Sequence, residues 1–187
     1  MTVTYTNADV SHGRLSVNTG GEDFTVNLTV PVNMGIRNAG DGTINLGSGN
    51  DIVQDYSGHD LTINLGAGND NLFIGQKVGA FHIDITGGTG NDFLQSASVA
   101  AIMNFNYSFS GGQSQDGADG IKGFVLNQDT LTLHGVTQTQ FEQSFTVTNG
   151  SAGTVITDGT NDGWSLSLIG IHATAAQLLA DHVLIFA

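Results

Sequence analysis

The sequence predicts an all-β protein, built mostly as a stack of short parallel strands joined by glycine-rich turns. Three near-copies of one phrase, Gly-Xaa-Gly-Asn-Asp, end at Asp51, Asp70 and Asp92. The phrase therefore restarts after 19 and then 22 residues, which is typical of a repeat architecture. Between the phrases apolar and polar residues alternate, as in Thr43-Ile44-Asn45-Leu46, and this is the period of a strand with one buried face.

Composition excludes several classes of function. The 187 residues carry 17 acidic and 4 basic side chains, and the formal net charge of −13 argues against binding nucleic acid or an anionic membrane surface. No apolar run is long enough to span a bilayer, and residues 1–5 show no basic-then-apolar leader. The absence of cysteine removes disulfides and thiolate nucleophiles. An acidic chain with 27 glycines and one proline instead fits regular tight turns and a protein that binds a hard cation.

A second repeated series lies between the copies of the first. It begins at Asp23, Asp41 and Asp60 and continues as Xaa-Thr-(Val/Ile)-Asn-Leu, so each repeat holds two short strands and two turns. We expect these apolar residues to point inward: Ile44, Leu46, Ile63, Leu65, Ile83 and Ile85. We expect these polar residues to point outward: Thr43, Asn45, Thr62 and Asn64. A single coil cannot bury its apolar side but stacked coils can, so residues 1–107 are predicted to form a parallel β-solenoid.

The C-terminal part of the chain follows a different pattern. Residues 108–123 are rich in turn formers and are expected to form a loop. Residues 124–187 are expected to form a β-rich cap over the open end of the solenoid, with Trp164 in its core. Strands are predicted at 130–133, 144–147, 153–156 and 164–169, hairpin turns at 149–150 and 158–159, and a helix over 173–180.

The repeated turns have the chemistry of a calcium site. Ca²⁺ takes six to eight oxygen ligands from carboxylates and backbone carbonyls, and glycines allow a turn to direct several carbonyls to one place. Stacked strands lie about 4.8 Å apart, where two carboxylates repel by roughly 3 kcal/mol at an effective dielectric near 20. A bridging Ca²⁺ turns that repulsion into attraction. The predicted ligands are the side chains of Asp51, Asp70, Asp92, Asn50, Asn69 and Asn91 and the carbonyls of Gly47, Gly49, Gly66, Gly68, Gly88 and Gly90. A second ladder of ligands would be Asp23, Asp41 and Asp60.

These motifs resemble the glycine-rich nonapeptide of RTX proteins, Gly-Gly-Xaa-Gly-Xaa-Asp-Xaa-(large apolar)-Xaa. Residues 87–94 match every fixed position, whereas 46–53 and 65–72 lack only the first glycine. The resemblance implies a right-handed parallel β-roll with Ca²⁺ held between consecutive turns by the aspartates and the turn carbonyls. It also implies a type I secretion exporter as a partner and folding outside the cell, where calcium is millimolar. Residues 178–186 are similar to the uncleaved C-terminal export signals of that class.

Two departures qualify the resemblance, and the first is that the repeat intervals of 19 and 22 residues exceed the 18 residues of two nonapeptides. The second ladder departs from the pattern as well, because Asp41 and Asp60 precede the inward Ile44 and Ile63 by three residues instead of two.

The segment 129–187 resembles the region that follows the repeats in the non-catalytic R-modules of alginate epimerases. The resemblance therefore also allows binding of an extracellular polysaccharide.

Three functions follow from the sequence. The first is a secreted, non-enzymatic, calcium-binding protein with a structural, adhesive or export role. The second is a non-catalytic alginate-binding module of a secreted enzyme, and the third is ice binding by the outward Thr and Asn rows. No nucleophile motif is present, and the six histidines are scattered without the spacing of a zinc helix. Four further acidic residues are expected to be solvated turn residues: Asp116, Asp119, Asp158 and Asp162.

Overall fold

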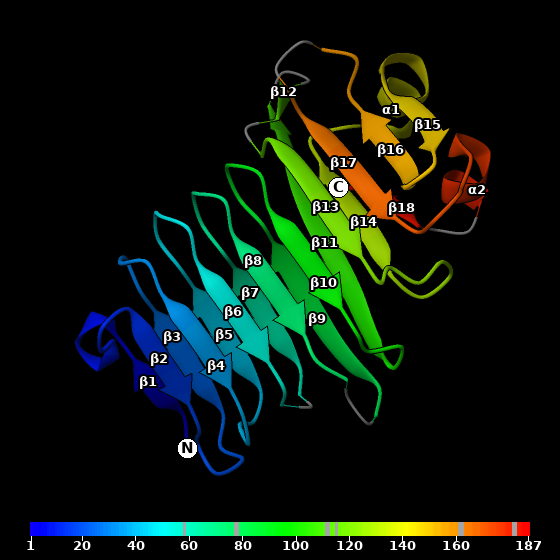
Figure 1. Ribbon diagram of the computed structural model, residues 1–187. Helices are drawn as coiled ribbons and strands as arrows, with labels where there is room; N and C mark the ends of the chain where they lie inside the picture. Colours follow the sequence, from blue (N-terminus) through cyan, green and yellow to red (C-terminus); the bar gives the residue numbers. More distant parts are fainter. Residues whose placement is uncertain (58, 77–78, 111–112, 115, 161–162, 181–182) are drawn as a thin grey trace.

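The computed structural model describes residues 1–57, 59–76, 79–110, 113–114, 116–160, 163–180 and 183–187. In this part of the chain the strands form two nine-stranded sheets, which lie face to face in Figure 1. The first sheet contains, in spatial order, β1 (Val3–Tyr5), β3 (Phe24–Asn27), β5 (Gly42–Asn45), β7 (Leu61–Asn64), β9 (Phe81–Thr86), β11 (Ala101–Ser110), β14 (Thr130–His134) and β18 (Leu184–Phe186), with β12 (Gln113–Ser114) paired to the end of β11.

The second sheet begins at the same end of the molecule. It contains, in spatial order, β2 (Arg14–Val17), β4 (Asn33–Ile36), β6 (Ile52–Asp55), β8 (Asn71–Ile74), β10 (Phe93–Ser96), β13 (Ala118–Lys122), β17 (Ser165–Ile169), β16 (Gly153–Thr157) and β15 (Thr146–Gly150). From β1 to β11 the chain alternates between the sheets, so each strand pairs in parallel with the strand two elements later. The protein is therefore mostly β with parallel strands, as the sequence predicts.

Residues of the same type stack in register, and the core lies between the two sheets. In the first sheet Val26, Ile44, Ile63 and Ile85 are successive partners, and all are buried. Every side chain predicted to point inward is no more than 7% exposed. The residues predicted to point outward are half-buried (Thr43) or exposed (Asn45, Thr62 and Asn64). The alternation along these strands was therefore interpreted correctly, because one face of each strand is covered and the other is not.

The expected loop over residues 108–123 is wrong in both halves, because residues 108–110 still belong to β11, residues 113–114 form β12 and a further strand follows. Residues 118–122 form β13, which lies inside the second sheet between β10 and β17 and pairs with both in parallel. Ile121 and Asp119 both point into the interior. Sequence patterning missed the strand because an aspartate stands at one of its inward positions, where the apolar alternation of a strand is broken.

The C-terminal residues extend both sheets and add two helices at the end opposite the N-terminus (Figure 1). The predicted hairpin pairing is confirmed, since β15–β16 and β16–β17 are antiparallel pairs, but residues 149–150 belong to β15 and the first turn lies at residues 151–152. The predicted helix is present as α2 (Ala175–Ala180), and the Gln177 N–H donates to the hydroxyl of Thr174 just before it. Trp164 is buried, as expected, in an aromatic cluster with Tyr107, Phe109 and Phe145.

One further helix and one short turn escaped prediction. Helix α1 (Gln138–Ser144) takes up Ser144, which was expected to start a strand, and β15 begins at Thr146 instead. A sequence signal was available, because Thr137 and Gln140 form a reciprocal capping box at the start of α1. The chain also has a 3₁₀ turn, η1 (Asn7–Asp9), near the N-terminus.

Candidate metal centre

Asp51, Asp70 and Asp92 form a column that runs across the N-terminal ends of neighbouring strands in the second sheet. Each lies directly before a strand, β6, β8 and β10 respectively, and those strands are neighbours. The turns that carry them also stack, because Ser48 pairs in parallel with Ala67, and Ala67 with Thr89. The three side chains point inward and are at most 3% exposed. The structure therefore brings together the three aspartates that the sequence singles out.

Each carboxylate of this column uses one oxygen to hold the preceding turn. Oδ1 of Asp51, Asp70 and Asp92 accepts a hydrogen bond from the backbone N–H of Val32, Asp51 and Asp70 respectively, at 2.6, 2.8 and 2.8 Å. The other oxygen, Oδ2, is buried and has no hydrogen-bond partner in the part of the chain that the structure describes. Burial of an unsatisfied anionic oxygen is costly. Each turn thus presents one oxygen that protein groups leave uncompensated.

The electrostatics of the column reflect this lack of compensation. Burial raises the pKa of Asp51 above its usual value, and the hydrogen bond from Val32 opposes that effect only in part. Burial raises the pKa of Asp70 to about 6, and the charge of Asp51 adds to the increase. Burial also raises the pKa of Asp92 to about 7, again with help from its carboxylate neighbours. The carboxylates of the column therefore hold protons more strongly than solvated aspartates do.

Asp119 is a fourth member of the column, and its interpretation as a solvated turn residue is wrong. It is 4% exposed, its Oδ1 accepts from the backbone N–H of Asp92 at 2.8 Å, and its Oδ2 has no partner among the described residues. Burial raises the pKa of Asp119 to about 8. Burial raises the pKa of Tyr107, whose hydroxyl has no geometric hydrogen-bond partner among the described residues, and the charge of Asp119 adds to the increase. Sequence analysis missed Asp119 because no Gly-Xaa-Gly-Asn phrase precedes it.

The glycines of the turns form two stacked columns that exclude any side chain. Gly66, Gly68, Gly88 and Gly90 all have positive φ, between 91° and 138°. A Cβ atom at any of them would overlap the carbonyl oxygen of a glycine in the preceding turn. Glycine is therefore required twice over, for the backbone conformation and for the close approach.

The turn carbonyls that were predicted as ligands already take part in the stack. The carbonyl of Gly47 accepts from the N–H of Ala67 at 2.8 Å, and that of Gly66 accepts from the N–H of Thr89 at 3.0 Å. A carbonyl oxygen has two lone pairs, so one hydrogen bond does not exhaust it. Metal binding by the six glycine carbonyls stays a prediction.

The asparagines of the repeated phrase form an outer column beside the aspartates. The Oδ1 atoms of Asn50, Asn69 and Asn91 accept the backbone N–H of the following turn, from Asn69, Asn91 and Ala118 respectively, at 2.8 to 2.9 Å. All three side chains are exposed. In this arrangement their oxygens hold the turns at a constant spacing, and a role as metal ligands stays a prediction.

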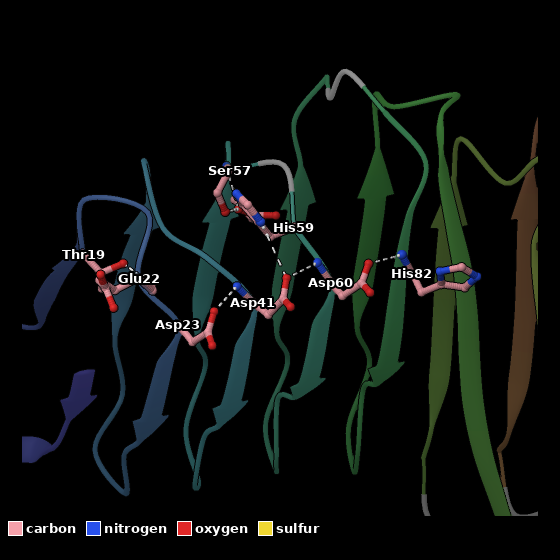
Figure 2. A network of polar contacts seen from close by, with 9 residues as sticks. Thr19, Glu22, Asp23, Asp41, Ser57, His59, Asp60 and His82 are labelled. Carbon is pink, nitrogen blue, oxygen red and sulfur yellow. Dashed lines mark hydrogen bonds and ion pairs between the residues drawn. The ribbon is translucent and has the colours of Figure 1, made fainter. Parts of the chain in front are cut away.

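The second predicted ladder also stacks, but it lies in solvent. Figure 2 shows Asp23, Asp41 and Asp60 side by side at the edge of the first sheet. Each Oδ1 accepts the N–H of the next turn, from Asp41, Asp60 and His82 at 3.2, 3.2 and 2.8 Å. The direction is opposite to that of the buried column, where the later carboxylate accepts from the earlier turn. Asp41 is also within 3.6 Å of Nδ1 of His59.

This exposed row borders a groove on the first sheet. The groove has a volume of about 450 Å³ and is lined mainly by carboxylates and threonines. Its polar lining residues include Asp23, Asp41, Asp60, Asp84, Thr25, Thr43, Thr62 and His82. The threonines that the sequence predicts to point outward, Thr43 and Thr62, are paired in register on neighbouring strands and line this groove.

The remaining acidic residues were predicted less well. The solvated interpretation is wrong for Asp116 and Asp158, which are 9% and 2% exposed. Asp116 accepts from the N–H of Ser108, and Asp158 accepts from the N–H and hydroxyl of Thr160. Asp162 and His182 lie outside the described residues. The described histidines are all exposed or half-buried, in keeping with the expectation of surface positions.

Side chains alone do not complete a metal site in the described chain. No three His, Cys, Asp or Glu side chains gather closely enough there to bind an ion by themselves. Any cation in the column would need backbone oxygens as well. Among the described helices none combines the length and apolar character needed to cross a membrane. Comparisons with known protein families, with curated proteins and with solved structures found no match.

Proposed function

We propose that this protein binds Ca²⁺ between successive turns of the buried column formed by Asp51, Asp70 and Asp92. The observation that carries the proposal is the set of Oδ2 atoms in this column. They are buried, stacked and without a hydrogen-bond partner among the described residues. A bound cation is the simplest group that compensates several such oxygens in a row, because one ion can bind two neighbouring carboxylates.

Protein cations do not fill this role in the described structure. Its two ion pairs, Met1–Glu22 and His59–Asp41, both lie outside the column. The chain as a whole has only 4 Lys and Arg against 17 Asp and Glu. A bound divalent ion would lower the resulting repulsion, which favours a role in which calcium stabilises the fold.

The donor set favours Ca²⁺ over other metals. The available groups are carboxylate oxygens and the backbone oxygens of glycine turns, which are ligands for hard cations. Ca²⁺ accepts six to eight ligands in flexible geometry, whereas Mg²⁺ demands a near-ideal octahedron and retains water. The turn glycines that would supply carbonyls are Gly47, Gly49, Gly66, Gly68, Gly88 and Gly90. Because these carbonyls can complete the ligand set, a Ca²⁺ ion does not need three carboxylates at one place.

The proposal includes an architecture and a setting. Alternation of the strands between two parallel sheets supports a β-solenoid over residues 1–107, in the form of the right-handed β-roll that the RTX resemblance implies. Such a protein would remain poorly folded in the calcium-poor cytosol and would fold after export, with a structural, adhesive or export-module role. Catalysis is not part of this function.

A second candidate function is binding of an extracellular polysaccharide in the groove of the first sheet. The groove offers hydroxyl and carboxylate groups repeated at the spacing of the strands, including Thr25, Thr43 and Thr62. An anionic sugar such as alginate would need bridging cations there, because Asp23, Asp41 and Asp60 line the same groove. Retention on an alginate column that depends on added Ca²⁺ would support this function. Ice binding receives no comparable support, because the threonine row lies in a hollow.

The primary proposal is tested by removing and restoring calcium. Protein freed of metal by chelation should unfold at a lower temperature, and added Ca²⁺ should restore strand signal in far-UV circular dichroism with saturation. Mg²⁺ at the same concentration should have a much smaller effect. A melting curve that chelation leaves unchanged, together with equilibrium dialysis that detects no bound Ca²⁺, would overturn the proposal.

A further inference from the structure

The third glycine turn differs from the first two at one inward position. In the first sheet the register places Leu46, Leu65 and Gly87 in one column, because the N–H of Leu46 bonds the carbonyl of Asn64 and that of Leu65 bonds the carbonyl of Thr86. Tyr107 occupies the next place, directly after the paired residues Asn106 and Thr86. A leucine side chain is therefore missing beside Tyr107, at a buried point of the structure.

Three buried oxygens without a partner among the described residues surround this place. A Cβ atom at Gly87 would lie 2.5 Å from Oδ2 of Asp92 and 3.6 Å from Oδ2 of Asp119. Both oxygens are unpartnered, and so is the hydroxyl of the 2%-exposed Tyr107. Accommodation of the bulky Tyr107 would explain the glycine, but it would leave all three oxygens unsatisfied, which is costly in a buried site.

We propose a further Ca²⁺ site between Asp92 and Asp119, at the point beside Gly87 that the Oδ2 atoms of both aspartates approach. Oδ2 of each aspartate and the phenol oxygen of Tyr107 are its side-chain ligands. The site rests on the proposed calcium function and extends it beyond the three Gly-Xaa-Gly-Asn-Asp turns, since no such phrase precedes Asp119. Gly117 still stacks on the carbonyl of Gly90 with positive φ, so the turn before Asp119 keeps the close approach of the other turns.

The site has a structural consequence for the second half of the chain. Asp119 belongs to β13, which pairs on one side with β10 of the repeats and on the other with β17 of the C-terminal hairpins. An ion bound by Asp92 and Asp119 therefore joins the repeats to the C-terminal part. Its loss would weaken that junction first, before the contacts between the earlier turns.

Three variants and one control separate this site from the others. Asp119→Asn retains Oδ1 as the acceptor for the Asp92 N–H and removes the charged oxygen. Gly87→Ala places a methyl group where the oxygens converge, and the backbone of Gly87 is not left-handed, so alanine fits its conformation. Tyr107→Phe is a third, milder variant that removes only the phenol oxygen. Asp129→Asn serves as the control, because both oxygens of that buried carboxylate are already hydrogen-bonded, to Met103 and Val125.

The measurements are the number of Ca²⁺ ions bound per chain, by equilibrium dialysis, and Tb³⁺ luminescence excited through Trp164. Trp164 is the only tryptophan and packs against Tyr107 at 5.9 Å between ring centroids, so its excitation reports on this end of the column. We expect Asp119→Asn and Gly87→Ala to lose one Ca²⁺ per chain and most of the Trp-sensitised emission. Tyr107→Phe should weaken Ca²⁺ at this site several-fold, and Asp129→Asn should keep both signals.

Distinct outcomes overturn the further site and the proposed function. If Asp119→Asn and Gly87→Ala bind as many ions as the wild type while Asp70→Asn binds fewer, the further site is wrong and the calcium function stands. If the wild-type protein binds no Ca²⁺ at millimolar concentration, both proposals fall. Circular dichroism at saturating Ca²⁺ identifies a variant that does not fold, and Tyr107→Phe then decides the question.

Discussion

The backbone N–H of Asp70 donates a 2.8 Å hydrogen bond to Oδ1 of Asp92 in the next turn, while Oδ2 of Asp92 is buried without a partner among the described residues. One oxygen of the carboxylate therefore sets the register of two turns, and the other carries charge that no protein group compensates. Asp51 and Asp70 stand in the same relationship. An amide can replace the first oxygen but not the second, so Asp→Asn substitutions separate the two roles.

Asp70→Asn should fold but lose most of its response to calcium. The amide retains the acceptor for the Asp51 N–H and removes a buried charge, so the metal-free variant should be at least as stable as the wild type at pH 8. Saturating Ca²⁺ adds about 2.7 kcal/mol to the free energy of unfolding for each site filled at one hundred times its Kd. Since Asp70 is shared by two gaps, more than half of the wild-type increment should disappear in urea denaturation with and without Ca²⁺.

A buried aspartate outside the column provides the control for this substitution. Asp129→Asn removes an acceptor for a backbone N–H and should cost about 1–3 kcal/mol, equally with and without Ca²⁺. A loss of the calcium increment in Asp129→Asn as large as that in Asp70→Asn would show that the effect is not specific to the column.

Stability of the metal-free protein should fall as the pH rises from about 5 to 8. Burial raises the pKa of Asp70 to about 6, of Asp92 to about 7 and of Asp119 to about 8, above the value of 3.8 in an unfolded chain. At a pH above 3.8 but below the folded pKa of each residue, the folded state retains a proton that the unfolded chain releases. The free energy of unfolding then decreases with pH, by on the order of 1 kcal/mol per pH unit for each proton retained.

Denaturation by urea at several pH values in metal-free buffer checks this slope. Added Ca²⁺ should stabilise the protein more at pH 8 than at pH 5, because protons compete for the same oxygens. A metal-free protein that gains stability over this range would contradict the assignment of uncompensated carboxylates.

Gly68→Ala should destabilise the turns by several kcal/mol. Gly68 has a φ of +138°, and a Cβ atom there would overlap the carbonyl oxygen of Gly49. Both the backbone strain and the clash are unavoidable. Gly35→Ala, in β4, is the matched control, because Gly35 has ordinary φ and its Cβ would meet nothing within 4 Å. That change should be neutral or stabilising by up to about 1 kcal/mol. Thermal unfolding of the two variants compares them, and equal losses would refute the stacking argument.

Asp41→Asn should leave calcium-dependent stability almost unchanged. The carboxylate of Asp41 is 64% exposed and therefore solvated, in contrast to that of Asp70. Asp41→Asn keeps the acceptor for the Asp60 N–H, and Asp70→Asn keeps the acceptor for the Asp51 N–H. The two variants therefore differ mainly in whether the lost charge was exposed or buried. Calcium titrations of the two variants followed by circular dichroism make the comparison. An effect of Asp41→Asn equal to that of Asp70→Asn would place calcium in the exposed ladder as well.

Much of the fold was predictable because the repeats are periodic. Alternation in segments such as Thr43-Ile44-Asn45-Leu46 predicts which side chains are buried, and the spacing of Asp51, Asp70 and Asp92 predicts that they stack. Both inferences depend on regularities that each repeat carries locally. Helix α1 was missed although its capping box is present in the sequence, because residues 138–143 show no strand alternation and only one inward apolar residue, Phe141, and Ser144 was given to the following strand.

The sequence by itself determined the parallel strands, the inward residues and the three stacked aspartates, because each repeat encodes them in the same way. Only the tertiary structure showed that Asp119 continues the column and that Gly87 stands beside Tyr107 and the Oδ2 atoms of Asp92 and Asp119. These residues come from strands far apart in the chain, and no local pattern relates them. Likewise, burial of one ladder and exposure of the other follow from how the two sheets face each other, since only the packed structure decides which turn edge excludes water.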